Sequence, residues 1–340
     1  MKHAVRSIRS EPKPGTASPM PRMFLSAGVL ILTAIIAWLA ITKPWVMAVE
    51  IADAGQGGRR VNEEGVFGNY YPAGLEGLHP GILVIGGSEG GLDPQVDRDA
   101  RALNRQGFSV LALSFYRAPG QLSAFDRIPL ETFDRALDWL ARQHEVDRNR
   151  LAIVGMSKGA EAALLVASDR QDLSAVVAAV PSSVVWPGFD WARFRSLKHS
   201  SWSRAGRPVT ALPYGALRWQ DGMDSIYANG LKQVARHPDA VIPVEQSRAT
   251  ILLICGGKDQ VWPSCPMSAQ IKARSERLGV PRVVVLAYPE GDHGSFGSPL
   301  EPGGKPRRFG FSNEAPGSAA ARADSWPKVI AFLRQALGQN

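Results

Sequence analysis

The chain has 340 residues, of which 45% are hydrophobic and 21% are charged. This length and composition exclude a disordered chain and fit one large α/β domain, or two small ones, around a buried core. The formal net charge is +8, but residues 1–22 alone contribute +4, and no basic stripe with interleaved aromatic residues follows them. The composition therefore gives no support for nucleic acid binding.

The first predicted element is an apolar helix over 23–42. Its twenty residues carry no charge and are flanked by Arg22 and Lys43. At about 1.5 Å of rise per residue, such a helix spans roughly 30 Å, the thickness of a bilayer's hydrocarbon core. We therefore expect a basic cytoplasmic tail over 1–22 and a transmembrane anchor over 23–42, with the rest of this single-pass membrane protein on the periplasmic or another extracytoplasmic side. Cleavage as a signal peptide near 46–48, or burial of the helix within the fold, are the alternatives.

Short apolar runs then alternate with amphipathic segments. The runs are nearly continuous, as expected of parallel strands covered on both faces, and they occupy 81–87, 109–115, 151–155, 174–180, 249–257 and 282–288. The alternation predicts a mostly parallel, doubly wound α/β sheet over 64–340, preceded by a Gly-rich linker over 43–63. The aromatic-rich stretch 181–245 has no strand signal and is too long for a simple loop, so it predicts an inserted cap.

A serine between two glycines follows the third apolar run, in "LAIVGMSKGAE" at 151–161. The form GxSxG is weak by itself, but a strand before it and a helix after it are the context of a nucleophile elbow. The flanking glycines leave room for the tight turn that lifts the serine out of the sheet. We therefore expect Ser157 to be a nucleophile, and a simple helix cap is the alternative.

A serine hydroxyl needs a base, and a histidine base needs a carboxylate that holds its tautomer. His293 lies in "YPEGDHGSF", just after the last apolar run, so it is expected at the carboxyl edge of the sheet, where active sites of such sheets gather. Asp259 lies in "CGGKDQVWPS", after the preceding run. The order Ser157, Asp259, His293 is the order expected for this kind of sheet. A solvated loop histidine and a turn-capping aspartate are the alternatives.

Backbone N–H groups should stabilise the oxyanion of the transition state. One donor is expected from Lys158, the residue after the nucleophile, and the other from the loop "GGSEGG" at 86–91, with Ser88 or Glu89 as the candidates. A phosphate cradle is the competing interpretation of this loop, although it lacks the Lys-Ser/Thr pair of a P-loop and the full GxGxxG spacing. No cofactor and no metal are expected.

Two cysteines are present, Cys255 and Cys265. This number gives neither a disulfide framework nor a metal site. Two small buried residues are one interpretation, and a single bridge in an oxidising compartment is the other.

With these residues in place, the chain resembles the C-terminal catalytic domain of the acyl-CoA thioesterases and bile acid-CoA:amino acid N-acyltransferases, a branch of the α/β-hydrolases. The similarity depends on "GMSKGAE", "GGSEGGL", "IPVEQSRATILLICGGKDQVWPS" and "YPEGDHGSF". It implies an α/β-hydrolase fold, a thioester or related acyl substrate, and the roles of nucleophile, acid and base for Ser157, Asp259 and His293.

Two departures bear on the reaction. Members that transfer acyl groups to amino acids carry cysteine as the nucleophile, so the serine of this chain makes water the expected acceptor. The larger relatives also have an N-terminal β-sandwich, where this chain has the predicted anchor and linker. If the domain faces the periplasm, another ester or thioester replaces the cytosolic CoA esters as its substrate.

The sequence thus predicts a membrane-anchored serine hydrolase that opens an acyl thioester through an acyl-enzyme. A general carboxylesterase or dienelactone-hydrolase-like enzyme is the second hypothesis, and a non-catalytic membrane-anchored binding module is the third. Aromatic residues of the cap, namely Trp186, Phe189 and Trp191, either hold the acyl chain or belong to the core. The basic residues between 193 and 207 either attract an anionic substrate or form a solvated face.

Overall fold

The protein is described by a computed structural model that covers residues 22–42, 49–74, 76–190, 193, 195–280, 282–300 and 316–339. It divides into two compact units, Met1–Val46 and Met47–Asn340. In the first unit, the described part is helix α1 (Arg22–Thr42). The predicted basic tail lies outside the described residues, except for Arg22.

The predicted transmembrane anchor over 23–42 is contradicted. Across the described parts of the chain, every helix falls short of the length or the apolar character that crossing a bilayer requires. The expected single-pass membrane location, the extracytoplasmic placement of the catalytic domain and the membrane as a partner are contradicted with it.

The second unit is built on one mixed sheet in the order β15-β14-β9-β8-β4-β6-β3-β2. All neighbours from β15 to β6 are parallel, and β3 and β2 are antiparallel additions at one edge. Each of the six apolar runs forms one of the parallel strands. The strands are β2 (Arg59–Glu63), β3 (Val66–Tyr71), β4 (His79–Ile85), β6 (Ser109–Ser114), β8 (Val146–Met156), β9 (Leu173–Ala179), β14 (Thr250–Gly256) and β15 (Val283–Tyr288).

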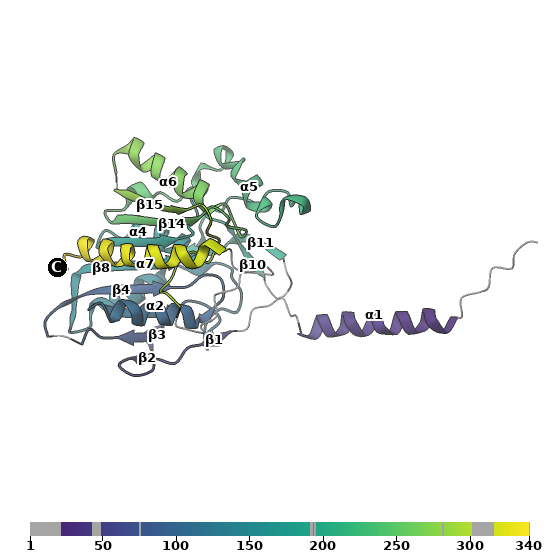
Figure 1. Ribbon diagram of the computed structural model, residues 1–340, viewed down its shortest axis with the longest axis horizontal. Helices are drawn as coiled ribbons and strands as arrows, with labels where there is room; N and C mark the ends of the chain where they lie inside the picture. Colours follow the sequence, from purple (N-terminus) through teal and green to yellow (C-terminus); the bar gives the residue numbers. More distant parts are fainter. Residues whose placement is uncertain are drawn as a thin grey trace, which may run out of the picture. The chain divides into compact units, whose positions relative to one another are not determined.

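Helices cover both faces of this sheet, which is why the central strands are apolar on both sides. Helices α2 and α7 pack on one face, where α7 crosses in front of the strands in Figure 1, and α3, α4 and α6 pack on the other. The bounds are α2 (Pro94–Asn104), α3 (Glu131–Ala141), α4 (Lys158–Asp169), α6 (Ser264–Leu278) and α7 (Pro316–Ala336).

The segment 43–63, predicted as a linker, contributes strands in its described part. β1 (Glu50–Ile51) pairs with β5 (Gly91–Leu92), and β2 pairs with β3 at the sheet edge. Only the central residue of β2, Val61, is buried, whereas its neighbours are exposed or half-buried. A charged edge strand with one buried residue has no apolar run, so the sequence pattern did not reveal it.

The cap region 181–245 holds short strands that pair outside the main sheet. Its elements are β10 (Pro187–Asp190), β11 (Arg195–Ser200), β12 (Trp202–Arg204), β13 (Arg207–Pro208), η1 (Trp219–Asp221), α5 (Ser225–Leu231), η2 (Val234–Arg236), η3 (Pro238–Ala240) and η4 (Val244–Gln246). β12 also pairs with the two-residue strand β7 (Ile128–Pro129), which connects the cap to the segment before α3. The cap has a small apolar core of its own, in which the fully buried ring of Trp186 stacks on Tyr214.

A buried ion pair within helix α4 binds two tryptophans of the cap through its glutamate. Lys158 Nζ lies 2.6 Å from Glu161 Oε2, and Glu161 is fully buried. The other oxygen of Glu161 accepts hydrogen bonds from the backbone N–H of Trp186 and from the indole N–H of Trp202, at 3.1 and 2.8 Å. Burial lowers the pKa of the Lys158 ammonium and raises the pKa of the Glu161 carboxyl, and each partner opposes the shift of the other. The pair therefore fixes two cap tryptophans against the helix that starts at the elbow.

We expect Lys158→Met to lower the free energy of unfolding by about 3–5 kcal/mol, because it leaves the carboxylate of Glu161 buried without a cation. The double variant Lys158→Met/Glu161→Gln removes both charges and keeps an amide oxygen for the two tryptophan donors. It should lose less stability than Lys158→Met alone, as measured by urea unfolding.

The matched control is Lys198→Met, at an exposed lysine of β11, which should change the free energy of unfolding by no more than about 0.5 kcal/mol. Glu161→Gln alone completes the cycle, and a double variant whose loss equals the sum of the losses of Lys158→Met and Glu161→Gln contradicts the interpretation of the two residues as one coupled unit.

Candidate active site

Ser157 lies in a strained turn between β8 and α4. Its backbone has φ 55° and ψ −121°, a conformation that L-residues rarely adopt. The turn is possible because glycines flank it: a Cβ on Gly155 would lie 2.4 Å from the carbonyl oxygen of Gly159, and a Cβ on Gly159 would lie 2.0 Å from that of Gly86. The strain holds the Ser157 hydroxyl above the carboxyl end of the sheet.

The structure brings Ser157 together with His293 and Asp259, which come from loops after β8, β15 and β14. His293 Nε2 lies 2.9 Å from Ser157 Oγ. His293 Nδ1 lies 2.9 and 3.0 Å from the two carboxylate oxygens of Asp259. The side chains of His293 and Asp259 are only 3% and 1% exposed, so water competes little for these hydrogen bonds. A carboxylate beside Nδ1 assigns the proton to that nitrogen and leaves Nε2 as the acceptor of the serine proton.

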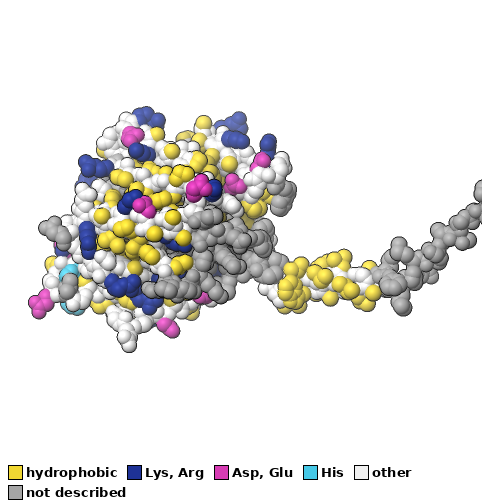
Figure 2. Space-filling view, viewed as in Figure 1, with side chains coloured by type: hydrophobic (Ala, Val, Ile, Leu, Met, Phe, Trp, Pro, Cys, Tyr) yellow, Lys and Arg dark blue, Asp and Glu magenta, His cyan; other side chains and the backbone are white. Residues whose placement is uncertain are grey.

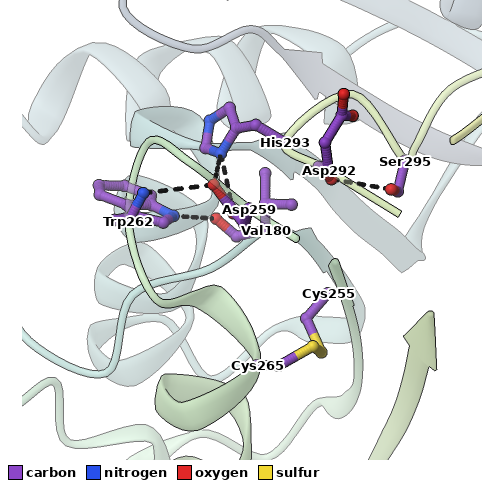
Figure 3. The surroundings of a disulfide bond; sticks show 8 residues. All are labelled: Val180, Cys255, Asp259, Trp262, Cys265, Asp292, His293 and Ser295. Carbon is purple, nitrogen blue, oxygen red and sulfur yellow. Dashed lines mark hydrogen bonds and ion pairs between the residues drawn. A yellow bond between two sulfur atoms is a disulfide. The ribbon is translucent and has the colours of Figure 1, made fainter. Parts of the chain in front are cut away.

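The loop that carries Asp259 is fixed from several sides (Figure 3). Asp259 Oδ1 also accepts the backbone N–H groups of Val261 and Trp262. The indole N–H of Trp262 donates to the carbonyl oxygen of Val180, at 3.0 Å, and the indole ring lies edge-on to the imidazole of His293, 5.8 Å between centroids. Cys255 and Cys265 form a disulfide across this loop, which decides between the two interpretations left open by the sequence.

The loop that carries His293 is held by helix α7. Asp292 points away from the imidazole (Figure 3); its carboxylate accepts the backbone N–H of Gly294 and the hydroxyl of Ser318. Ser318 also accepts the backbone N–H of Asp292, and Arg322 donates to the carbonyl oxygen of Gly294 at 2.7 Å. These contacts leave Asp259 as the carboxylate beside the imidazole.

The glycine-rich loop 86–91 lies close to Ser157 at Gly87, where a Cβ would lie 3.1 Å from Ser157 Cβ. The carbonyl oxygen of Ser88 accepts a hydrogen bond from the hydroxyl of Tyr116. The carbonyl oxygen of Glu89 accepts one from the guanidinium of Arg117, at 3.0 Å. The Glu89 carboxylate turns back toward Gly87, since that same Cβ would lie 2.9 Å from Glu89 Oε2. A carboxylate inside the loop disfavours a phosphate there, which argues against the cradle interpretation.

The aromatic residues expected at the acyl chain lie in different environments. Trp186 is fully buried in the cap core and donates its indole N–H to Ser182 Oγ at 2.8 Å. Phe189 is half-buried, and its backbone N–H donates to the carbonyl oxygen of Phe125. Trp191 lies outside the described residues.

Basic side chains of the cap are in part neutralised. Arg193 pairs with Asp190 at 2.8 Å, and Arg204 pairs with Asp169 at 2.7 Å and also with Asp134. On the face shown in Figure 2, Lys and Arg side chains are scattered among acidic, apolar and uncharged groups and form no continuous stripe. These pairs favour a solvated, structural face over an anion site.

Sequence reasoning missed several residues that shape the site. Glu161 was visible as the last residue of "SKGAE", but its contacts with the cap tryptophans join positions 25 and 41 residues away. No sequence motif marks Trp262, Ser318 or Arg322 as residues of the site. Within the residues that the structure describes, no group of three or more His, Cys, Asp or Glu could hold a metal ion.

An arrangement of this kind can take a proton from a serine hydroxyl and return it to a leaving group. The histidine accepts the proton at Nε2 as the oxygen attacks a carbonyl carbon, and the carboxylate stabilises the imidazolium that forms. Backbone N–H groups at the start of α4 and in the loop 86–91 are the candidates for stabilising the oxyanion.

Solved structures share the fold. A dienelactone hydrolase-like promiscuous phosphotriesterase from metagenomic libraries superposes with a TM-score of 0.51 at 18% identity, over 82% of this chain and 98% of that one. A puromycin-hydrolyzing peptidase from Mycobacterium tuberculosis gives a TM-score of 0.56 at 16% identity, over 86% of this chain and 42% of that one. At such identities the likeness establishes an α/β-hydrolase-like fold with a mixed sheet.

Relatives found by sequence are more similar to this chain than the solved structures are. Human acyl-coenzyme A thioesterase 1 is 27% identical over 279 residues, which cover 77% of this chain and 61% of the relative. Rat acyl-coenzyme A amino acid N-acyltransferase 2 is 28% identical over 299 residues, which cover 84% of this chain and 68% of the relative. The chain thus spans about six-tenths of the length of the thioesterases it matches. The family model for the C terminus of BAAT and acyl-CoA thioester hydrolases matches residues 128–339, more than half of the chain, and the chain belongs to this family.

Proposed function

We propose that this chain is a serine hydrolase that cleaves acyl thioesters of the acyl-CoA class through an acyl-enzyme on Ser157. The observation that carries the proposal is the continuous hydrogen-bonded arrangement of Ser157, His293 and Asp259, with 2.9 Å at the serine and 2.9 and 3.0 Å at the carboxylate. Membership in a family that contains acyl-coenzyme A thioesterases supports the choice of substrate class.

In the first half-reaction, Ser157 Oγ attacks the thioester carbonyl while His293 Nε2 takes its proton. The C–S bond then breaks, the thiol leaves with the proton held by His293, and the acyl group stays on the serine as an ester. The amide of Lys158 and an amide of the loop 86–91, of Ser88 or Glu89, stabilise the oxyanion, each by about 3–4 kcal/mol. Asp259 keeps the imidazole in the tautomer that accepts at Nε2.

In the second half-reaction, His293 takes a proton from water, which attacks the acyl-serine ester. The acyl C–O bond breaks, the proton goes to Ser157 Oγ, and a carboxylic acid leaves. Because the imidazole serves both halves, its position against Ser157 and Asp259 limits the rate of each. Water is the acceptor in this proposal because the nucleophile is serine, whereas the resemblance associates amino acid acceptors with cysteine.

Ser157→Ala should abolish covalent labelling by a fluorophosphonate and lower kcat by roughly 10³–10⁶-fold, because no other group can form the acyl-enzyme. Labelling is read by mass spectrometry and turnover by thiol release from palmitoyl-CoA. Ser196→Ala, at an exposed serine of β11, is the control and should leave both unchanged. Undiminished turnover in Ser157→Ala would refute the assignment of the nucleophile.

The substrate class is tested by comparing acyl-CoA esters with p-nitrophenyl esters of the same acyl chains. We expect kcat/KM to be at least about tenfold higher for the thioester, because contacts with the CoA portion contribute binding energy to the transition state. Turnover of the oxygen esters alone indicates a general carboxylesterase or a dienelactone-hydrolase-like enzyme. A protein that neither labels nor turns over any ester is a binding module.

A further inference from the structure

The disulfide closes the loop that carries Asp259. Cys255 belongs to the end of β14, and Cys265 belongs to the first turn of α6, ten residues later. Figure 3 shows the bridge below the loop. Along the chain, Asp259 and Trp262 lie between the two bridged cysteines. The covalent ring therefore contains the two residues of this loop that touch the imidazole of His293.

The first half of the loop is fixed by hydrogen bonds to the loop of the base. The backbone N–H of Gly257 donates to the carbonyl of Tyr288 and that of Lys258 donates to the carbonyl of Gly291, both at 2.8 Å. Gly256 lies so close to Asp292 that a Cβ there would be 2.4 Å from its carbonyl oxygen. The strand side of the loop thus moves only together with the loop of His293.

The helix side of the loop has fewer polar contacts. In the described structure no side chain caps the start of α6, and the buried hydroxyls of Ser264 and Ser268 in its first turns have no hydrogen-bond partner. On this side the indole of Trp262 donates to the carbonyl oxygen of Val180, and the hydroxyl of Ser182 donates to Met267 Sδ. The disulfide to Cys265 adds the covalent link from the first turn of α6 to β14. Asp259 accepts the N–H groups of Val261 and Trp262 just before that turn, so a shift of the turn is transmitted to its carboxylate.

We infer that Cys255 and Cys265 are positioning residues of the active site, and that the closed disulfide holds Asp259 and Trp262 in place against His293. The inference rests on the proposed function, since it concerns the same three side chains. Cys255 is 1% exposed but Cys265 is half-buried, so a small dithiol can reach the bridge. A dithiol thiolate attacks one sulfur, the Cys255–Cys265 bond breaks, each sulfur gains one proton and one electron, and the dithiol is oxidised to its own disulfide.

Reduction should slow the phosphonylation of Ser157 by a fluorophosphonate by roughly tenfold or more, because a displacement of about 1 Å at a catalytic group has effects of this size. The experiment measures the second-order rate constant of fluorophosphonate labelling for the full chain before and after dithiothreitol treatment, and again after reoxidation. Mass spectrometry with maleimide counts the free thiols. Recovery on reoxidation is expected.

The double variant Cys255→Ser/Cys265→Ser is the matched control. Its labelling rate should equal that of the reduced wild type and should not respond to dithiothreitol. Circular dichroism on every sample restricts the comparison to folded protein. The reduced wild type is a second form of the protein in which the disulfide is open. Free thiols in protein isolated without reductant, or an unchanged labelling rate after complete reduction, would overturn the inference.

Asp259→Asn separates positioning from simple loss of stability. In this background the carboxylate is already lost, so reduction should change the residual labelling rate by no more than about twofold. The same tenfold loss in both backgrounds shows that the disulfide does not act through Asp259 and contradicts the inference.

Failure of the proposed function is recognisable separately. A wild type that labels but hydrolyses no acyl-CoA disproves the substrate class and leaves the labelling comparison intact. If nothing labels, the low-field proton signal of His293 Nδ1–H, recorded by NMR without turnover, carries the test. That signal should shift or disappear on reduction, and an unchanged signal contradicts the inference.

Discussion

The site depends on one close approach of two backbones, where the first turn of α4 meets the end of β4. Gly159 lies against the carbonyl of Gly86 with no room for a side chain, and Gly155 has no room for one against the carbonyl of Gly159. This contact places the residue between them, Ser157, at a positive φ, and it brings the loop 86–91 beside the nucleophile. The serine, the start of a helix and a row of backbone amides therefore come together through a single steric requirement.

Much of this arrangement could be predicted from the sequence because it is local or follows the order of the strands. Ser157 is marked by the glycines that its turn needs, and Asp259 and His293 each follow an apolar run. Since the carboxyl ends of parallel strands share one edge of a sheet, loops after such runs meet there. The same pattern predicted the six parallel strands, of which all but the half-exposed edge strand β15 are buried along their apolar runs.

Other features could not be predicted because they arise from contacts between distant segments or from sums over many residues. The edge strand β2 has one buried residue and no apolar run. The contact of Glu161 with Trp202 exists only after the cap has folded onto α4. The bridge between Cys255 and Cys265 depends on how the turn into α6 runs, and two cysteines ten residues apart do not specify that path. For residues 23–42, the absence of charge suggested an anchor, but no helix in the described parts of the chain meets the requirement for spanning a bilayer.

Helix α7 follows Ser157, Asp259 and His293 in the sequence, yet it holds the loop that carries His293. Ser318 and Arg322 hold the backbone of Asp292 and Gly294 on either side of His293. The strands before Ser157 and Asp259, β8 and β14, both pair with β9, whereas the loop of His293 also needs α7 to be docked. A chain in which α7 is not docked therefore lacks two of the contacts that restrain the loop of His293.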